Sequence, residues 1–374
     1  MTSTRSRDAM AQALELARQA SIETEPNPRV GCVLLDPQGA VIGQGSTQTV
    51  GGPHAEIMAL RDAAARNHSV QGATAYVTLE PCSHHGRTGP CCDALIAAGI
   101  TKVVASIADP NPLVAGQGFE RLRAAGIEVA VGAGADASRE LNIGFFSRMV
   151  RKTPWVRLKV AASLDGRTAL ANGTSQWITS EAARTDGHAW RARAGTVLTG
   201  VGTVLEDDPR LDVRLVQTPR QPLLVVVDSQ LQTPPDAKIF HASRPVWIYA
   251  AHRNEARQAA LEARGATVSY LPNPQGKVDL AAMLRDLAVR EINTLHVEAG
   301  HKLNGSLMRE GLVDELLVYL APKFIGDGLG MASQPHAAGA LTALGDALAL
   351  EFKSFEALGP DLRIVARVAG RDRF

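Results

Sequence analysis

The sequence predicts two successive α/β domains, and three observations support that fold class. The chain has 374 residues, more than most single domains contain. Short apolar stretches typical of strands alternate with helical stretches along its length, which favours layered sheets with helices on both faces. The polar, proline-ended segment 148–154 interrupts this alternation. We therefore expect one domain over residues 1–150 and a second over residues 151–374.

The first domain is expected to alternate helices and strands in a regular order. A helix is predicted over residues 8–20 because Met10, Ala13, Leu14 and Ala17 fall on one helical face. Strands at about 30–35 and 40–45 follow, joined by a turn at 36–39 whose proline and glycine suit its backbone angles. The remaining predictions are a helix from His54 to about residue 66, a strand at 73–79, a helix opening at the second cysteine pair, a strand at 102–107, a helix near 117–125 and a short strand at 127–131.

The second domain is predicted to begin with a strand at 155–161. Further strands are expected at about 196–200, 223–227, 246–250, 294–298 and 315–321, with helices between them. Periodicity alone predicts an α/β fold here and does not distinguish among the α/β folds.

Composition narrows the classes of function. The chain has 39 basic and 38 acidic residues, so it lacks the overall positive charge of a protein that binds a nucleic-acid backbone. A phosphorylated small molecule fits better as substrate. No apolar run is long enough to span a bilayer, and the first residues do not resemble a signal sequence. We expect a cytoplasmic homo-oligomer without nucleic-acid or membrane partners.

Four side chains in the first quarter of the chain have the chemistry of a hydrolytic zinc site. Glu56 follows His54 by two residues, and Cys82 and Cys91 lie downstream. One imidazole and two thiolates fill three corners of a tetrahedron around Zn²⁺ and leave the fourth for water. The metal lowers the pKa of that water toward ~7, and a neighbouring carboxylate can pass its proton to a leaving amine. We therefore expect His54, Cys82 and Cys91 to bind one zinc ion, and Glu56 to be the catalytic proton shuttle.

This spacing is close to the H-x-E…P-C-x-x-C pattern of zinc-dependent nucleobase deaminases, but eight residues separate the two cysteines. His84 and His85 in that insertion are alternative ligands, although a fourth protein ligand would exclude water. Cys92 is an alternative to Cys91, yet it starts an apolar helical pattern and is expected to point elsewhere. Cys32 lies in an apolar run and is expected to be a buried, inert thiol.

The positions of His54 and Cys91 near predicted helix N-termini support the zinc interpretation. Unpaired backbone N–H groups and the positive end of the helix dipole favour a thiolate over a thiol. A cysteine that binds zinc must be a thiolate.

Longer stretches of sequence resemble one known family. Residues 26–33 read PNPRVGCV and residues 80–92 read EPCSHHGRTGPCC, while residues 159–167, 175–180 and 297–300 read KVAASLDGR, SQWITS and VEAG. Together they resemble the bifunctional deaminase and reductase of riboflavin biosynthesis over nearly the whole chain. The chain departs from the family at Gly89, where a proline is usual.

The resemblance implies both fold and activity. It implies a cytidine-deaminase-like three-layer α/β/α domain followed by a dihydrofolate-reductase-like domain. The first would remove the 2-amino group of a diaminopyrimidinone ribosylamino 5′-phosphate, and the second would reduce the ribosyl group to ribityl with NADPH. Zn²⁺ and NADPH are the implied cofactors.

The resemblance also implies the binding residues. The NADPH site would be lined by Ala161, Trp177, Thr203, Asp207, Ser229, Gly300, His301, Lys302, Leu303, Asn304, Gly305 and Ser306. The substrate would be held by Asn27, Lys159, Ser175, Arg191, Leu211, Arg214 and Glu298. Arginine suits a phosphate because its guanidinium group can donate two parallel hydrogen bonds.

Several of these residues have a plain structural alternative. Asp165, a further candidate for the substrate ribose, could be only a turn former, and Lys159 could lie on a solvated strand face. Trp177 could belong to the core. The glycines of segment 300–306 could bring backbone N–H groups close to a phosphate at a helix start, or could simply form a turn.

The sequence leaves two rival functions. A deaminase of RNA or DNA would share the zinc motif, but the near-neutral charge argues against it. A purely structural zinc module normally has four protein ligands, so three ligands beside a glutamate argue against it as well.

Overall fold

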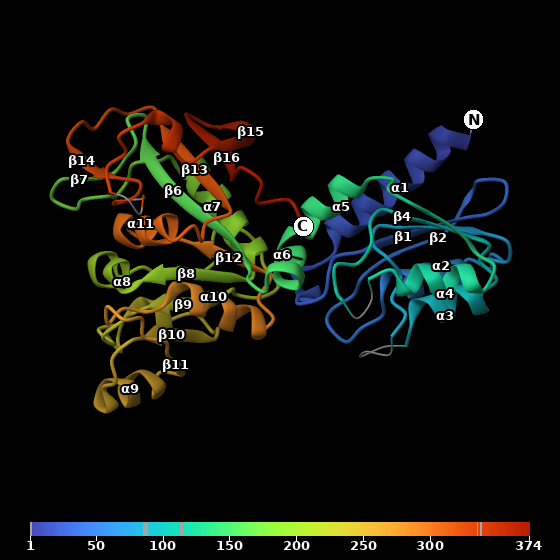
Figure 1. Ribbon diagram of the computed structural model, residues 1–374, viewed down its shortest axis with the longest axis horizontal. Coiled ribbons are helices and arrows are strands. Elements are labelled where there is room, and N and C mark those ends of the chain that lie inside the picture. The colour runs from blue at the N-terminus through green and yellow to red at the C-terminus, as the bar shows by residue number, and fades with distance from the viewer. Residues whose placement is uncertain (1, 85–88, 113–114, 335, 337–338) are drawn as a thin grey trace. The chain divides into compact units, whose positions relative to one another are not determined.

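The computed structural model describes residues 2–84, 89–112, 115–334, 336 and 339–374. The chain divides into two compact units, Met1–Arg151 and Lys152–Phe374. Figure 1 shows each unit as a sheet with helices packed on it.

The first unit is built on a five-stranded sheet in the order β2-β1-β3-β4-β5. Strand β1 pairs antiparallel with both β2 and β3, whereas β3, β4 and β5 run parallel. The strands are β1 (Gly31–Leu35), β2 (Val41–Ser46), β3 (Thr74–Val77), β4 (Lys102–Ala105) and β5 (Glu128–Val131). All five strand predictions for this unit are confirmed, with ends that differ by at most two residues.

Helices cover both faces of this sheet, which gives three layers. Helix α1 (Thr2–Gln19) packs its Met10 and Leu14 against Val33 on one face. On the other face, Leu34 packs with residues of α2 (Ala55–Ala65), α3 (Cys91–Ala97) and α4 (Gln117–Ala124). Adjacent residues of β1 thus point to opposite layers, as alternation in a strand requires.

Two glycines of β2 allow α2 to approach the sheet closely. A side chain at Gly43 or Gly45 would collide with the backbone of Ala59. Ala55, Ala59 and Ala63, spaced by four residues, form the buried face of α2 toward β2. This close packing fixes the N-terminal end of α2, where His54 and Glu56 lie.

The end of the first unit differs from its prediction. Helices α5 (Ala135–Leu141) and α6 (Ile143–Arg151) follow β5, so residues 148–151 of the expected boundary segment are helical. Phe145 and Phe146 of α6 are buried in the core of the first unit. No helix was predicted over residues 135–151, although Phe145, Phe146 and Met149 lie on one apolar helical face.

The second unit contains a nine-stranded sheet in the order β11-β10-β9-β8-β12-β6-β13-β16-β15. From β11 to β13 all neighbours are parallel, and β16 and β15 are added antiparallel. The strands are β6 (Trp155–Ser163), β8 (Thr196–Gly200), β9 (Leu223–Val227), β10 (Val246–Ala250), β11 (Ala266–Tyr270), β12 (Thr294–Val297), β13 (Glu315–Ala321), β15 (Leu350–Leu358) and β16 (Asp361–Val368). A small separate sheet pairs β7 (Arg167–Leu170) with β14 (Gly328–Gly330).

Helices again cover both faces. Helices α10 (Leu280–Val289) and α11 (His301–Arg309) contribute to the core on one face, together with Leu316 and Val318 of β13. The opposite face is covered by α7 (Glu181–Ala194), α8 (Val201–Asp207) and α9 (Glu255–Glu262). Short 3-10 helices lie at Ile22–Thr24, Lys238–Phe240 and Leu344–Asp346.

Side-chain caps explain where several of these helices begin. Ser180, Asn254 and Asp279 each accept a hydrogen bond from a backbone N–H in the first turn of α7, α9 and α10. Strands β8, β9, β10 and β13 have the predicted bounds. Strands β7, β11, β14, β15 and β16 were not predicted.

Candidate functional site

His54, Cys82 and Cys91 form a compact cluster in the first unit. Their candidate ligand atoms all lie within 4.8 Å of one another. Nδ1 of His54 is 3.5 Å from Sγ of Cys82 and 3.3 Å from Sγ of Cys91. Ligands about 2.0–2.3 Å from a tetrahedral zinc ion would be separated by roughly 3.6 Å. The cluster therefore has the size and the donor set of a zinc site with one open position.

Helix starts position two of the three ligands. His54 is the N-cap of α2 and Cys91 is the first residue of α3. The backbone N–H of Cys91 donates to Sγ of Cys82 at 3.3 Å. The Cys91 side chain, together with His54 and this N–H, lowers the pKa of Cys82. These contacts favour the thiolate that zinc requires.

Glu56 lies in the first turn of α2, next to the cluster. Only 4% of the residue is exposed, and its carboxylate interacts with the Cys91 side chain. Burial, aided by Cys82, raises the pKa of Glu56 to about 7. A carboxyl group with such a pKa can both accept and return a proton near neutral pH.

The alternative ligands lie outside the cluster. Sγ of Cys92 donates to the carbonyl oxygens of Pro81 and Gly118, at 3.2 and 3.5 Å. Cys32 is fully buried, and burial raises its pKa. Among the described residues, the three-ligand group does not include His84, and His85 lies outside the described residues.

Gly89 is not required by packing. A side chain added there would meet nothing within 4 Å. A β-carbon at this position would therefore meet no atom of the described part of the chain.

Glu80 is a residue of this site that sequence reasoning missed. Its buried carboxylate accepts hydrogen bonds from the backbone N–H groups of Asp109, Gly116, Gly118 and Phe119, at 2.9–3.3 Å. It therefore ties the segment that precedes Cys82 to the start of α4. Burial, with Glu80 and Cys82 nearby, raises the pKa of Asp109 to about 7. Its position before the ligand Cys82 was the only local signal for Glu80.

Asn27 lies in a half-buried loop before β1 that the end of the first unit holds in place. Asn142 accepts from the backbone N–H of Arg29 at 2.8 Å and donates to the Arg29 carbonyl oxygen at 2.9 Å. Arg148 donates to the carbonyl oxygen of Pro26 at 3.0 Å. These partners are separated by more than a hundred residues in sequence, so no local pattern predicted them.

In the second unit, several residues expected to bind NADPH lie at one edge of the sheet. Strands β6, β8, β9 and β12 are parallel, so their carboxyl ends meet there. Thr203 follows β8, Ser229 follows β9, and Gly300 follows β12. This edge is where open α/β sheets bind their ligands.

Some of these residues touch directly. The Gly300 N–H donates to Oγ1 of Thr203 at 3.1 Å. Ser175 hydrogen-bonds to the side chain of Asp207. Gly300 is the N-cap of α11, so the segment 301–306 forms the first turns of that helix.

Gly300 and Gly305 have different roles, since Gly300 is the N-cap of α11 and Gly305 lies inside the helix. The backbone N–H groups at the start of α11 are suited to an anion because the first turn of a helix leaves them without intrahelical partners. Gly305 lies further along the helix, where a side chain would collide with the backbone of Ser333. Packing therefore accounts for Gly305.

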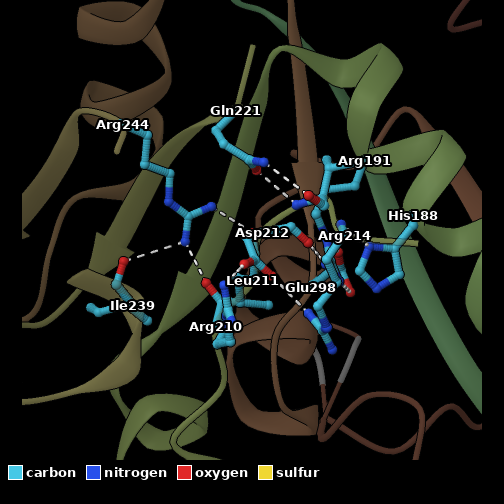
Figure 2. A network of polar contacts seen from close by, with 11 residues as sticks. His188, Arg191, Arg210, Leu211, Asp212, Arg214, Gln221, Ile239, Arg244 and Glu298 are labelled. Carbon is cyan, nitrogen blue, oxygen red and sulfur yellow. Dashed lines mark hydrogen bonds and ion pairs between the residues drawn. The ribbon is translucent and has the colours of Figure 1, made fainter. Parts of the chain in front are cut away.

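Glu298 is the centre of a buried network of charges, part of which Figure 2 shows. Nε and Nη2 of Arg191 donate to its two carboxylate oxygens at 2.6 and 3.0 Å. Nζ of Lys159 lies 3.6 Å from the same carboxylate. Despite burial, Arg191 and Lys159 hold the pKa of Glu298 well below its usual range. The carboxylate is therefore ionised at neutral pH.

Two histidines beside this network are neutral. Nδ1 of His188 accepts from the backbone N–H of Arg214 at 3.1 Å, and burial lowers its pKa to about 4. His296 is fully buried next to Glu298, and burial lowers its pKa to about 3. Neither residue carried a recognisable motif.

The two arginines expected to hold phosphate have different surroundings (Figure 2). Arg191 is buried, and it also donates to the carbonyl oxygen of Asp212. Arg214 pairs with the Asp212 carboxylate at 2.7 Å, but 46% of its side chain is exposed. Leu211, which lies between Arg191 and Arg214 in the sequence, is buried. Its carbonyl oxygen accepts a hydrogen bond from Arg244. Arg214 is thus better placed than Arg191 to meet a phosphate.

Asp165 and Trp177 have partners within the protein. Asp165 accepts from Oγ of Ser163 at 2.6 Å and from the N–H groups of Ile325 and Gly326, and the Ser163 bond is the main cause that lowers its pKa to about 2. It therefore joins two loops, which favours the turn interpretation. Trp177 is 62% exposed, with the Arg184 guanidinium 4.7 Å from its ring centre, so it is not a core residue.

Among the described residues, no helix combines the length and the apolar character needed to cross a membrane.

Two protein families match separate parts of the chain. Residues 3–107 match the cytidine and deoxycytidylate deaminase zinc-binding region. Residues 154–364 match the RibD C-terminal domain.

Similar proteins cover nearly the whole chain. The riboflavin biosynthesis protein RibD of Escherichia coli is 45% identical over 94% of this chain and 96% of its own, and that of Aquifex aeolicus is 40% identical over 95% and 96%. The solved structure of Acinetobacter baumannii RibD covers 97% of this chain and 99% of its own, with a TM-score of 0.86 and 38% identity. The diaminohydroxyphosphoribosylaminopyrimidine deaminase/5-amino-6-(5-phosphoribosylamino)uracil reductase of Thermotoga maritima covers 99% and 100%, with a TM-score of 0.85 and 30% identity.

Proposed function

The chain belongs to the RibD family of bifunctional riboflavin biosynthesis proteins, and on that basis we propose how its two halves divide the work. Residues 1–150 remove the 2-amino group of a diaminopyrimidinone ribosylamino 5′-phosphate by hydrolysis. Residues 151–374 then reduce the ribosyl group to ribityl with NADPH. The observation that carries the proposal is the three-ligand cluster beside buried Glu56, in a chain whose other half matches a reductase.

The deaminase residues have distinct tasks. Zinc held by His54, Cys82 and Cys91 would supply hydroxide at neutral pH. Glu56 would accept a proton from the attacking water and deliver it to the departing nitrogen, so that ammonia leaves. Its burial supports this role because a desolvated carboxylate is a stronger base than one in water. Asn27 helps to hold the pyrimidine.

The reductase half supplies binding and orientation. No protein side chain can donate hydride, so NADPH supplies it when bound. We assign to the cofactor Ala161, Trp177, Thr203, Asp207, Ser229 and residues 300–306. The contact between Thr203 and Gly300, the hydrogen bond between Ser175 and Asp207, and the shared carboxyl edge of the sheet support this assignment.

The substrate would lie next to the charged network. Ser175, Leu211 and Arg214 hold the sugar phosphate, with Arg214 providing the accessible guanidinium. Lys159 and Glu298, 3.6 Å apart, would bind the sugar through its hydroxyl groups, while Arg191 orients Glu298 by donating to both carboxylate oxygens.

We further propose that the protein works in the cytoplasm as a homo-oligomer on this phosphorylated pyrimidine, without nucleic-acid or membrane partners.

Product analysis tests the proposed function. The zinc-loaded chain is incubated with the diaminopyrimidinone substrate, first without and then with NADPH. Without NADPH we expect ammonia and the deaminated ribosylamino compound, and with NADPH the ribityl compound. A ribityl product that keeps its 2-amino group would show that the order of the two steps is wrong. Release of ammonia from RNA but not from this substrate would favour a nucleic-acid deaminase instead.

A further inference from the structure

Asp212 is a buried residue whose carboxylate holds two exposed arginines, as Figure 2 shows. Only 2% of Asp212 is exposed. Nη2 of Arg210 lies 2.6 Å from its Oδ2, and Nη1 of Arg214 lies 2.7 Å from its Oδ1. The two guanidinium groups therefore lie next to each other, one on each oxygen of the same carboxylate. Of the Arg210 and Arg214 side chains, 48% and 46% are exposed.

The backbone between these two arginines is held by side chains from other parts of the second unit. Arg244 donates to the carbonyl oxygens of Arg210 and Leu211, both at 2.5 Å. Arg191 of α7 donates to the carbonyl oxygen of Asp212. Two further guanidinium groups thus fix the first half of this stretch.

The second half of the stretch is held in the same way. The side-chain amide of Gln221 accepts from the N–H of Val213 and donates to its carbonyl oxygen, both at 2.8 Å, and Nδ1 of His188 accepts from the N–H of Arg214 at 3.1 Å. Leu211 has a φ of 50°, in the left-handed region that residues with a side chain rarely adopt. Such a conformation persists where the surrounding contacts over-determine it, which is common at ligand sites. The exposed guanidinium groups are therefore presented on a well-fixed backbone.

Positive charge exceeds negative charge around this carboxylate. Arg210, Arg214 and Arg244 bring three cations to the one anion of Asp212. Burial, with Arg191 nearby, lowers the pKa of Arg244 to about 10, and Asp212 offsets only part of this effect. A phosphate monoester carries about −1.5 to −2 charges at pH 7, which matches the excess of two positive charges.

We propose that Arg210 is a second phosphate-binding cation of the reductase site, held beside Arg214 by Asp212. This inference rests on the proposed function, which assigns the sugar phosphate to Arg214. Two adjacent guanidinium groups can donate to separate oxygens of one phosphate. Each nitrogen of the Arg191 guanidinium group already donates within the protein, to Glu298 or to the Asp212 carbonyl oxygen, so the phosphate falls to the exposed pair. Asp212 is a positioning residue, since both of its carboxylate oxygens are taken by the arginines that it orients.

Reduction by the full-length chain tests the proposal, with NADPH oxidation followed on the deaminated ribosylamino substrate and on its dephosphorylated form. Arg210→Gln removes a cation, so it should raise KM for the phosphorylated substrate about tenfold relative to KM for the dephosphorylated one. Arg210→Lys keeps the charge and should restore most of this preference. Arg285→Gln is the matched control, because Arg285 is an exposed arginine on α10, and it should keep the preference of the unaltered chain.

Binding of ribose 5-phosphate, measured by titration calorimetry, separates this inference from the proposed function. The unaltered chain should bind it, and Arg210→Gln should weaken binding about tenfold. This measurement decides the role of Arg210 even if the unaltered chain fails to oxidise NADPH, a failure that would count against the proposed function alone.

Three results would each overturn the proposal. The unaltered chain could fail to bind ribose 5-phosphate, or Arg210→Gln could bind it as tightly as Arg285→Gln does. An equal rise in KM for the phosphorylated and the dephosphorylated substrate in Arg210→Gln would show that Arg210 supports the fold of the site and does not hold phosphate.

Discussion

At the scale of single residues, Glu56 and the zinc ligands combine a local sequence pattern with burial. His54 and Glu56 share the N-terminal end of α2, and Cys91 begins α3. The sequence was enough to predict that His54, Cys82 and Cys91 form one metal-binding group, because such a group depends on residue types and short spacings. Glu80 and Asn142 could not be predicted in the same way, since their role lies in hydrogen bonds to distant backbone.

The substitution Glu56→Gln should separate metal binding from catalysis. The amide has nearly the same size and leaves all three ligands in place, but it cannot shuttle a proton. Deamination should fall by roughly 10²–10⁴ while zinc content stays unchanged. Ammonia release and metal analysis measure the two effects, with Glu120→Gln, an exposed position on α4, as control. Undiminished ammonia release with zinc bound would show that Glu56 has another role.

The cysteines should divide into ligands and a non-ligand. Cys82→Ser and Cys91→Ser should each lose zinc and deaminase activity, because a hydroxyl is a poor replacement for a thiolate. Cys92→Ser should keep both, because a serine hydroxyl can donate to the Pro81 carbonyl oxygen as the thiol does. Metal analysis of the three variants decides this assignment, and zinc loss in Cys92→Ser would contradict it.

At the scale of elements, apolar composition determined what could be predicted. Strands β8, β9, β10 and β13 are mostly buried and rich in apolar residues, and their bounds followed from sequence alone. Strand β15 was missed because its charged and apolar residues do not alternate regularly across the bulge at Lys353. The ion pair of Arg191 with Glu298 could not be predicted from local sequence either, because the two residues are 107 positions apart.

The link between α7 and β12 through Arg191 and Glu298 predicts different effects for the two arginines. Arg191→Ala would leave the buried Glu298 carboxylate without its main partner, and should lower the free energy of unfolding by about 3–5 kcal/mol. Arg214→Ala should leave stability nearly unchanged and raise KM for the phosphorylated substrate.

Chemical denaturation measures the stability effect, with Arg193→Ala, an exposed position on α7, as control. Steady-state kinetics on phosphorylated and dephosphorylated substrates measure the effect of Arg214→Ala on KM. An equal Arg214→Ala penalty on both substrates would remove Arg214 from the phosphate site.

The neutral histidines His188 and His296 predict how the stability of the second unit depends on pH. Burial lowers their pKa values to about 4 and about 3, below the value of ~6.5 expected in the unfolded chain. At pH values between the folded and the unfolded pKa, the unfolded chain binds more protons than the folded chain. Stability is therefore fully present above about pH 6.5 and is lost as the pH falls toward the folded pKa values, by up to ~1.4 kcal/mol per pH unit for each histidine.

Urea unfolding at several pH values between about 7.5 and about 5 measures this slope. His188→Gln, whose amide oxygen can still accept from the Arg214 N–H, should reduce it. A slope that His188→Gln leaves unchanged would show that His188 does not contribute.

At the scale of the whole molecule, one chain combines a deaminase unit and a reductase unit. The zinc ligands and Glu56 all belong to the first unit, and the residues assigned to NADPH all belong to the second. Each unit has its own buried core. The metal should therefore matter for one reaction only, although both serve the same substrate in succession.

Removal of zinc is the most direct test of this claim, with NADPH oxidation as the measured quantity. The zinc-depleted chain should oxidise NADPH at the full rate with the already deaminated ribosylamino substrate, and hardly at all with the diaminopyrimidinone substrate. Added zinc should restore NADPH oxidation with the diaminopyrimidinone substrate and leave NADPH oxidation with the deaminated substrate unchanged. Equal loss of both reactions on zinc removal, or NADPH oxidation by the diaminopyrimidinone substrate without zinc, would contradict the account.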